Sequence, residues 1–278
     1  MDGRTLSGVE ALLRWQHSEH GPIPPDRFIP LAEQTGLIVE LGRWVLDRAL
    51  RDLRTFAELT PGLRVNVNVA PRELAEADYV EAVAEALARH GVSADRLTLE
   101  LTESQLPEDA EIISRLERLA ALGVQLSIDD FGTGQSSLAR LQRLPVNQVK
   151  LDRSFLSTID QGPGNATLVR SMVELGHALG LQMVAEGIER ESQFALLADL
   201  PCQLGQGYLF GRPLASEAIT ELLANTAAAA AHGAADRLTP AARRQWPLPQ
   251  SAPAAAHPIQ PGAAGTVFAS QTRLGARH

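Results

Sequence analysis

Short β-rich runs alternate with amphipathic helical patterns through the first 210 residues, and this alternation constrains the fold more than any other feature. The runs cover residues 9–13, 64–69, 97–101, 124–128, 148–151, 182–185 and, more weakly, 207–210. Between them apolar residues recur at helical spacing, as in residues 110–122 before Gly123. Repeated strand–helix units predict an α/β protein with a (β/α)₈ TIM-like barrel rather than an open sheet. Seven runs are present, so one strand is missing.

The overall composition predicts a soluble, cytoplasmic protein. With 278 residues, of which 45% are hydrophobic, the chain can bury a sizeable core. Its apolar runs are far shorter than the ~20 residues that a membrane-spanning helix needs, so we expect no membrane segment. No secretory signal opens the chain. Cys202 is the only cysteine and cannot form an internal disulfide, which fits a reducing compartment.

The last fifth of the chain differs in composition from the rest. Alanine, proline and glycine dominate from Asn225 onward, and this part carries a formal charge of +4 against −12 for residues 1–224. We therefore expect a folded domain over residues 1–224 and a disordered Ala/Pro-rich tail over residues 225–278. The acidic folded part argues against a nucleic-acid polymer as partner.

Polar and charged side chains gather where the predicted strands end, which is the edge at which TIM barrels carry their active sites. They are Glu10, Arg14, Asn66, Asn68, Glu100, Glu103, Asp129, Asp130, Lys150, Asp152, Glu186, Glu189 and Gln206. Any one of these acids has an ordinary role as a helix N-cap or a solvated loop charge. Together, however, so many carboxylates in one barrel mouth would repel one another unless cations lay between them.

The residue types at these strand ends indicate which cations fit. Histidine and cysteine are absent there, and oxygen ligands alone favour Mg²⁺ or Mn²⁺ over zinc. Asp129 and Asp130 could share two ions ~3.5–4 Å apart, an arrangement used for in-line attack on phosphate esters. Lys150, the only lysine among 25 basic residues, would hold the attacking hydroxide or the phosphoryl oxygens. A two-metal phosphoesterase is predicted, with a Mg²⁺-dependent barrel that stabilises an enolate as the alternative.

Several segments of the chain resemble motifs of one family. The segment Glu10-Ala11-Leu12-Leu13-Arg14-Trp15 resembles the signature of the EAL-domain family, the cyclic di-GMP phosphodiesterases. Further family motifs follow in order at residues 25–33, 67–69, 100–103, 129–134, 150–152, 185–189 and 206–208. The resemblance covers roughly residues 2–223 and implies an EAL-type barrel.

The resemblance also implies roles for the matching residues. The ligands of one metal would be Glu10, Asn68, Glu100 and Asp129, and those of the second Asp129, Asp130 and Glu186. The remaining catalytic residues would be Lys150, which orients the nucleophilic water, Asp152 as a neighbouring acid, and Glu103 as the anchor of the loop over residues 129–137. Substrate would be contacted from Arg14, Leu12, Glu189 and Gln206. The implied reaction hydrolyses cyclic di-GMP to the linear dinucleotide pGpG with two Mg²⁺ or Mn²⁺ ions.

The start of the chain departs from the family pattern. In the family, an opening helix and a first strand with a Gln-Pro pair precede a hairpin that residues 2–8 resemble. Because the chain begins inside that hairpin, we expect a barrel without its first strand and with two unpaired sheet edges. A truncated fragment without activity and a non-catalytic cyclic di-GMP receptor are therefore alternatives to an enzyme. The resemblance also leaves open a homodimer and an upstream sensory or cyclase domain.

Overall fold

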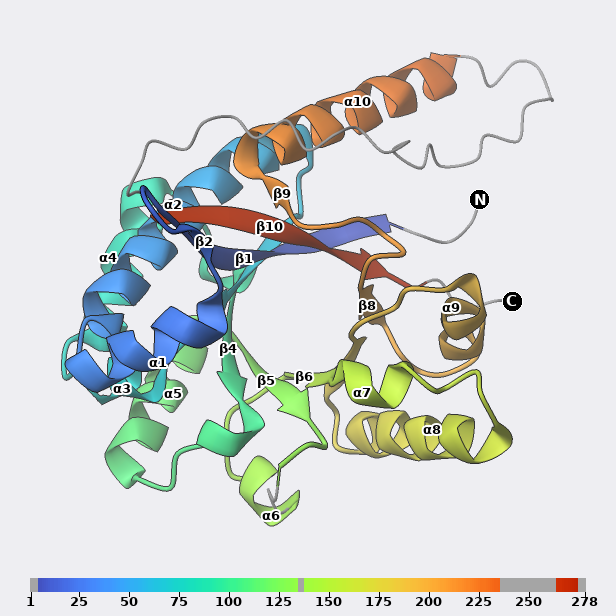
Figure 1. Cartoon of the computed structure of the whole chain (residues 1–278), viewed down its shortest axis with the longest axis horizontal. Helices are drawn as coiled ribbons and strands as arrows, with labels where there is room; N and C mark the ends of the chain where they lie inside the picture. Colours follow the sequence, from blue (N-terminus) through green and yellow to red (C-terminus); the bar gives the residue numbers. More distant parts are fainter. Residues whose placement is uncertain (1–4, 135–137, 236–263, 275–278) are drawn as a thin grey trace.

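Eight strands close into a barrel that is surrounded by helices (Figure 1). The computed structural model describes residues 5–134, 138–235 and 264–274. The barrel strands are β1 (Thr5–His17), β3 (Arg64–Asn68), β4 (Leu97–Thr102), β5 (Gln125–Phe131), β6 (Gln148–Leu151), β7 (Gln182–Ala185), β8 (Leu204–Gln206) and β10 (Ala264–Arg273). Two short strands, β2 (Gly21–Ile23) and β9 (Leu214–Ala215), pair with β1 and β10 respectively. The expected α/β barrel is present.

The helices follow the strands in the order that the sequence predicts. They are α1 (Pro25–Thr35), α2 (Ile38–Leu59), α3 (Pro71–Ala75), α4 (Tyr79–His90), α5 (Ala110–Ala121), α6 (Leu138–Leu141), α7 (Arg153–Leu156), α8 (Pro163–Ala178), α9 (Glu191–Ala198) and α10 (Ser216–Ala235), with 3₁₀ turns at Ala94–Arg96 and Glu103–Gln105. The Asp109 side chain begins α5 by accepting hydrogen bonds from two backbone N–H groups. Within the described ranges, no helix has the length and apolar character needed to cross a membrane.

Polar residues line the inside of the barrel because side chains alternate along each strand. On β4, Leu97, Leu99 and Leu101 belong to the hydrophobic core, while Thr98 and Glu100 between them are buried on the opposite face. The same alternation on the other strands buries polar side chains inside the barrel, among them Asn66, Ser127, Gln148 and Lys150. The interior of the barrel is thus lined by polar side chains and enclosed by an apolar layer.

Strand β10 closes the barrel between β1 and β8. It runs antiparallel to both, and its pairing with β1 extends from Thr5 opposite Arg273 to Trp15 opposite Ala264. The six remaining contacts around the ring, from β1 through β3 to β8, are parallel. The expectation of two unpaired sheet edges is therefore wrong, because a strand from the far end of the chain pairs with both edges.

The structure differs from the expected disordered tail over residues 225–278 in two segments. Helix α10 continues to Ala235, and residues 264–273 form β10, so these segments of the predicted tail are regular. The five prolines that suggested irregular structure all fall within residues 236–263, outside the described residues. The assignment of residues 1–224 as a separate domain stays a prediction.

The seventh predicted strand lies three residues too late. Residues 204–206 form β8, and residues 207–210 form a turn instead of a strand. Gly207 has a φ of +156°, and a Cβ at this position would lie only 2.2 Å from the backbone oxygen of Ile188. Only glycine fits such a close approach, so the chain bends away from the barrel directly after Gln206.

A buried carboxylate outside the barrel gives the fold a pH-dependent element. Glu73 on α3 is 4% exposed and accepts a hydrogen bond from the Ala70 N–H at 2.9 Å. Its carboxylate lies against α2, where a Cβ at Gly42 would be 1.8 Å from Oε1. Burial raises the pKa of Glu73 to about 7, and the nearby charge of Glu33 adds to the effect.

We predict that ionisation of Glu73 lowers stability as the pH rises. Because the pKa of Glu73 in the fold is above the ordinary value of 4.5, its contribution is fully present below about pH 4.5 and is lost as the pH passes through about 7. The difference in unfolding free energy between Glu73→Gln and the parent should therefore be up to ~3 kcal/mol more favourable to the variant at pH 8 than at pH 5. Urea unfolding at the two pH values measures this, with exposed Glu85→Gln as a charge-matched control. A gain that is equal at both pH values would contradict the assignment.

Candidate functional site

The carboxyl ends of the parallel strands bring a group of acids together around one lysine. The Lys150 side chain on β6 is 1% exposed and lies inside the barrel. Its Nζ lies 2.8 Å from Glu186 Oε1, 2.9 Å from Glu100 Oε2, 3.3 Å from Asp129 Oδ1 and 3.4 Å from Glu10 Oε2. Three of these carboxylates lie on β1, β4 and β5, and the fourth directly follows β7. All four therefore contact a single ammonium on β6.

Side-chain amides hold two of these carboxylates from neighbouring strands. The Glu10 carboxylate on β1 accepts a hydrogen bond from Nδ2 of Asn68 on β3 at 2.9 Å. It accepts another from Nε2 of Gln206 on β8 at 2.6 Å. Glu100 on β4 accepts from Asn66 Nδ2 at 2.7 Å. Glu10 is thereby held by amides from strands on either side of β1. Asn66, which the resemblance left without a role, positions Glu100.

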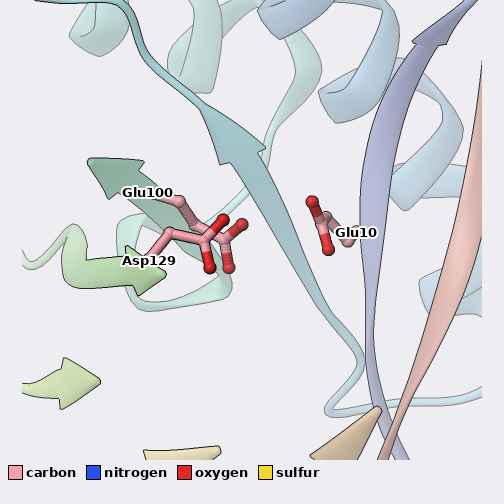
Figure 2. A group of neighbouring side chains, drawn as sticks. All are labelled: Glu10, Glu100 and Asp129. Carbon is pink, nitrogen blue, oxygen red and sulfur yellow. The ribbon is translucent and has the colours of Figure 1, made fainter. Parts of the chain in front are cut away.

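The acids form two overlapping clusters of the kind that can hold metal ions. Ligand atoms of Glu10, Glu100 and Asp129 lie within 4.8 Å of one another, and so do those of Asp129, Asp130 and Glu186. Figure 2 shows Glu100 and Asp129 side by side, with Glu10 directed toward them from β1. Asp129 belongs to both clusters, as the sequence analysis expected of a shared ligand. Asp130 has a positive φ of 55°, which turns the backbone at the end of β5.

The pKa values of these acids respond to burial and to one positive charge. Burial alone would lower the pKa of Lys150, but the carboxylates raise it well above its ordinary value. Burial would raise the pKa of Glu10, yet Lys150 and the two amide donors lower it. Burial raises the pKa of Glu100 well above its ordinary value and that of Glu186 to about 8. The cluster therefore has more acid groups than Lys150 can keep ionised.

Asp130 and Asp152 lie at the rim of the same cluster. Burial raises the pKa of Asp130, and the negative charges of Asp129 and Asp152 raise it further. Asp152 caps α7 by accepting a hydrogen bond from the Ser154 N–H at 2.9 Å. The structure thus gives Asp152 a position beside the second cluster and a structural role at the start of a helix.

Glu103 holds the loop that follows β5. It is buried at 3% exposure, and its Oε2 accepts hydrogen bonds from the N–H groups of Gly132 at 2.7 Å and Gly134 at 3.2 Å. These two glycines come directly after Asp129, Asp130 and Phe131, so the contact restrains the backbone that carries two candidate ligands. Residues 135–137 of this loop lie outside the described residues.

The predicted substrate-contacting residues lie at different distances from the central cluster. Gln206 contacts Glu10 directly. Arg14, on the same face of β1 as Glu10 and Leu12, is half-buried, and its Nη1 donates to the Leu13 oxygen at 2.8 Å. Burial lowers the pKa of the Arg14 guanidinium, and the charge of Glu10 opposes this. Glu189 is exposed, and among the described residues no hydrogen bond joins its carboxylate to the cluster.

Residues of β10 also face the site, and the sequence analysis missed all of them. Ala269 pairs with Glu10, and Gln271 pairs with Gln206, so both are directed into the barrel. The signal that could have found them is the β-rich run over residues 264–273, which the proline-rich and alanine-rich surroundings obscured.

The donor set of the two clusters fits hard divalent cations. Every group in them offers oxygen, either from a carboxylate or from the Asn68 amide, and histidine and cysteine are absent. Mg²⁺ and Mn²⁺ favour such ligands. The surplus of acids over bases around Lys150 also requires additional positive charge for full ionisation.

Comparison with known proteins shows the family. The EAL domain profile matches residues 1–213. MucR of Pseudomonas aeruginosa, a bifunctional diguanylate cyclase/cyclic di-GMP phosphodiesterase, is 46% identical over 224 residues, which are 80% of this chain and 32% of MucR. NbdA of the same organism, a cyclic di-GMP phosphodiesterase, is 46% identical over 217 residues, which are 77% of this chain and 28% of NbdA.

The solved structures agree with this result. A structure described as PaMucR phosphodiesterase in complex with c-di-GMP superposes with a TM-score of 0.72 at 44% identity, covering 78% of this chain and 92% of that one. The present chain spans only about a third of the length of MucR and of NbdA. The family profile and the curated relatives each cover more than three quarters of the chain, which therefore belongs to the EAL domain family.

Proposed function

We propose that this chain hydrolyses one phosphodiester bond of cyclic di-GMP to give pGpG, with Mg²⁺ or Mn²⁺ as cofactor. The observation that carries the proposal is the pair of oxygen-ligand clusters that share Asp129 and surround Lys150. The names of MucR and NbdA support the substrate, because both are cyclic di-GMP phosphodiesterases.

The ligands of two cations would come from the two clusters. One ion would be held by Glu10, Asn68, Glu100 and Asp129, and the other by Asp129, Asp130 and Glu186. Bound there, the ions would supply positive charge for a phosphate and lower the pKa of a water molecule. Gln206 and Asn68 keep the Glu10 carboxylate in place by their two hydrogen bonds.

The role proposed for Lys150 is to hold the attacking water or a phosphoryl oxygen. Its Nζ contacts carboxylate oxygens of Glu100 and Glu186, which are themselves candidate metal ligands. Once those oxygens hold cations, Lys150 has N–H groups available for water or phosphate. A compact ammonium suits this position inside the barrel better than a wide guanidinium does.

The remaining residues would bind substrate and order the site. Arg14 offers a positive charge on the face of β1 that carries Glu10 and can meet a phosphate of the substrate. Leu12 on the same face would contact its non-polar parts. Gln206, which donates to Glu10, and Glu189 would contact the substrate as well. Glu103 keeps the loop after Asp130 fixed through two backbone hydrogen bonds. Asp152 would act through its negative charge beside Asp130.

Further proposals concern the cellular setting of this activity. We propose a cytoplasmic location because Cys202 is a buried free thiol, as in proteins of reducing compartments. An upstream sensory or cyclase domain is also proposed, because the relatives are longer proteins. A homodimer stays a proposal that rests on the family resemblance.

The proposed reaction can be tested with purified protein. Purified protein incubated with cyclic di-GMP and Mg²⁺ or Mn²⁺ should release pGpG, measured by chromatography of the nucleotides. EDTA should abolish turnover, and excess Mn²⁺ should restore it. Tight binding without turnover would instead support the receptor, and neither binding nor turnover would support an inactive fragment.

The role proposed for Lys150 can be tested by substitution. Lys150→Ala should lower kcat by roughly 10²–10³-fold, the usual effect of removing one preorganised donor at a reacting oxygen, while KM changes little. Lys150→Arg keeps the charge but should restore little of the activity, because the guanidinium is too large for the buried position. Steady-state kinetics of both variants measure this, with circular dichroism to show that they fold. Near-parent activity of Lys150→Arg would contradict the proposed role.

A further inference from the structure

The closure of the barrel depends on a strand from the C-terminal end of the chain. In the part of the chain that the structure describes, β10 is the strand that joins β1 to β8. Figure 1 shows β10 beside β1, so the two ends of the sequence lie next to each other in the barrel wall. Both β1 and β8 thereby have a pairing partner on the side that faces β10.

We propose that β10, which joins β1 to β8, positions Glu10 and Gln206 in the acid cluster. The inference deepens the proposed function and rests on it for its activity measurement, whereas its structural measurement is independent of that function.

The outer face of β10 is anchored to the helix layer. Phe268 is fully buried, and its ring meets the ring of Phe56 on α2 edge-on at 5.2 Å between centroids. Just beyond the strand, the Leu274 N–H donates to the Gln203 oxygen at 2.9 Å, and its side chain lies next to Gly205. Apolar packing and backbone pairing therefore hold β10 along its whole length.

The inner face of β10 spans the contact between Glu10 and Gln206. Ala269 lies opposite Glu10, and Gln271 lies opposite Gln206. Oε1 of Gln206 and Nε2 of Gln271 are both buried without a hydrogen-bond partner within the described residues. One is an acceptor and the other a donor on paired residues, so a hydrogen bond between the two amides would satisfy both. Gln271 is then a positioning residue that orients the Gln206 amide toward Glu10.

A disulfide across the β1–β10 pair tests whether the chain's own strand closes the barrel. Thr5 and Arg273 are paired and exposed, so Thr5→Cys with Arg273→Cys places two thiols at a distance suited to a disulfide. Thr5→Cys with Ser270→Cys is the mismatched control, three residues out of register. Burial raises the pKa of Cys202 to about 12, so this native thiol competes poorly.

Mild oxidation of the full-length protein at low concentration should give a monomer with an internal disulfide in the matched variant only. Non-reducing electrophoresis and intact mass measure this. A disulfide-linked dimer would overturn closure in cis, because the strand would then come from a second copy. Absence of the disulfide, or equal yield in the mismatched control, would overturn the position of β10 itself.

The disulfide-locked protein then tests the role of Gln271 separately from folding. Gln271→Leu should leave the disulfide yield and melting temperature unchanged but weaken Mn²⁺ affinity roughly tenfold, as loss of an outer contact to a ligand does. kcat should fall with KM nearly constant. Ser270→Ala, on the opposite face of β10, should match the parent.

Parent-like Mn²⁺ affinity and kcat in Gln271→Leu would overturn the positioning role. If the locked parent binds Mn²⁺ but does not hydrolyse cyclic di-GMP, the proposed function is wrong. In that case the Mn²⁺ affinity of Gln271→Leu still decides the inference about β10.

Discussion

The interaction on which the rest of the site depends is the burial of one ammonium among four carboxylates. A buried charge is very costly unless it is paired, and Lys150 at 1% exposure is paired four times over. Burial, with the charges of the neighbouring carboxylates, raises the pKa values of Glu100 and Glu186, whereas Lys150 and two amide donors lower that of Glu10. The acids around Lys150 therefore attract further cations, and their oxygen donors favour hard cations.

The central site was predictable because it follows from topology. Parallel strands in a barrel end at the same edge, so acids at the ends of several such strands must meet, whatever their separation in the sequence. Glu10 and Glu100 are 90 residues apart, yet both contact Lys150. The same rule could not reveal amide contacts such as that of Asn66 with Glu100, because they depend on side-chain positions inside the barrel.

The closing strand could not be predicted for two physical reasons. Pairing between Glu10 and Ala269 joins residues more than 250 positions apart, and nothing local in either segment specifies such a partner. The β-rich run over residues 264–273 also lies within a tail whose alanine and proline content argues for irregular structure. Composition describes an average over the tail, whereas ten residues are enough to form a strand. Likewise β8 was misplaced because a three-residue strand carries little periodicity.

The position of Ala269 connects the closure of the barrel with the chemistry inside it. A strand that pairs with β1 at Glu10 must direct one side chain into the barrel at the level of the first acid cluster. Alanine fills that place with a single methyl group, so it leaves the space around Glu10 to Lys150, Asn68 and Gln206. A larger residue there would displace Glu10 from the contacts that hold it. The sequence of a closing strand is therefore constrained on both faces, by packing on Phe56 outside and by the acid cluster inside.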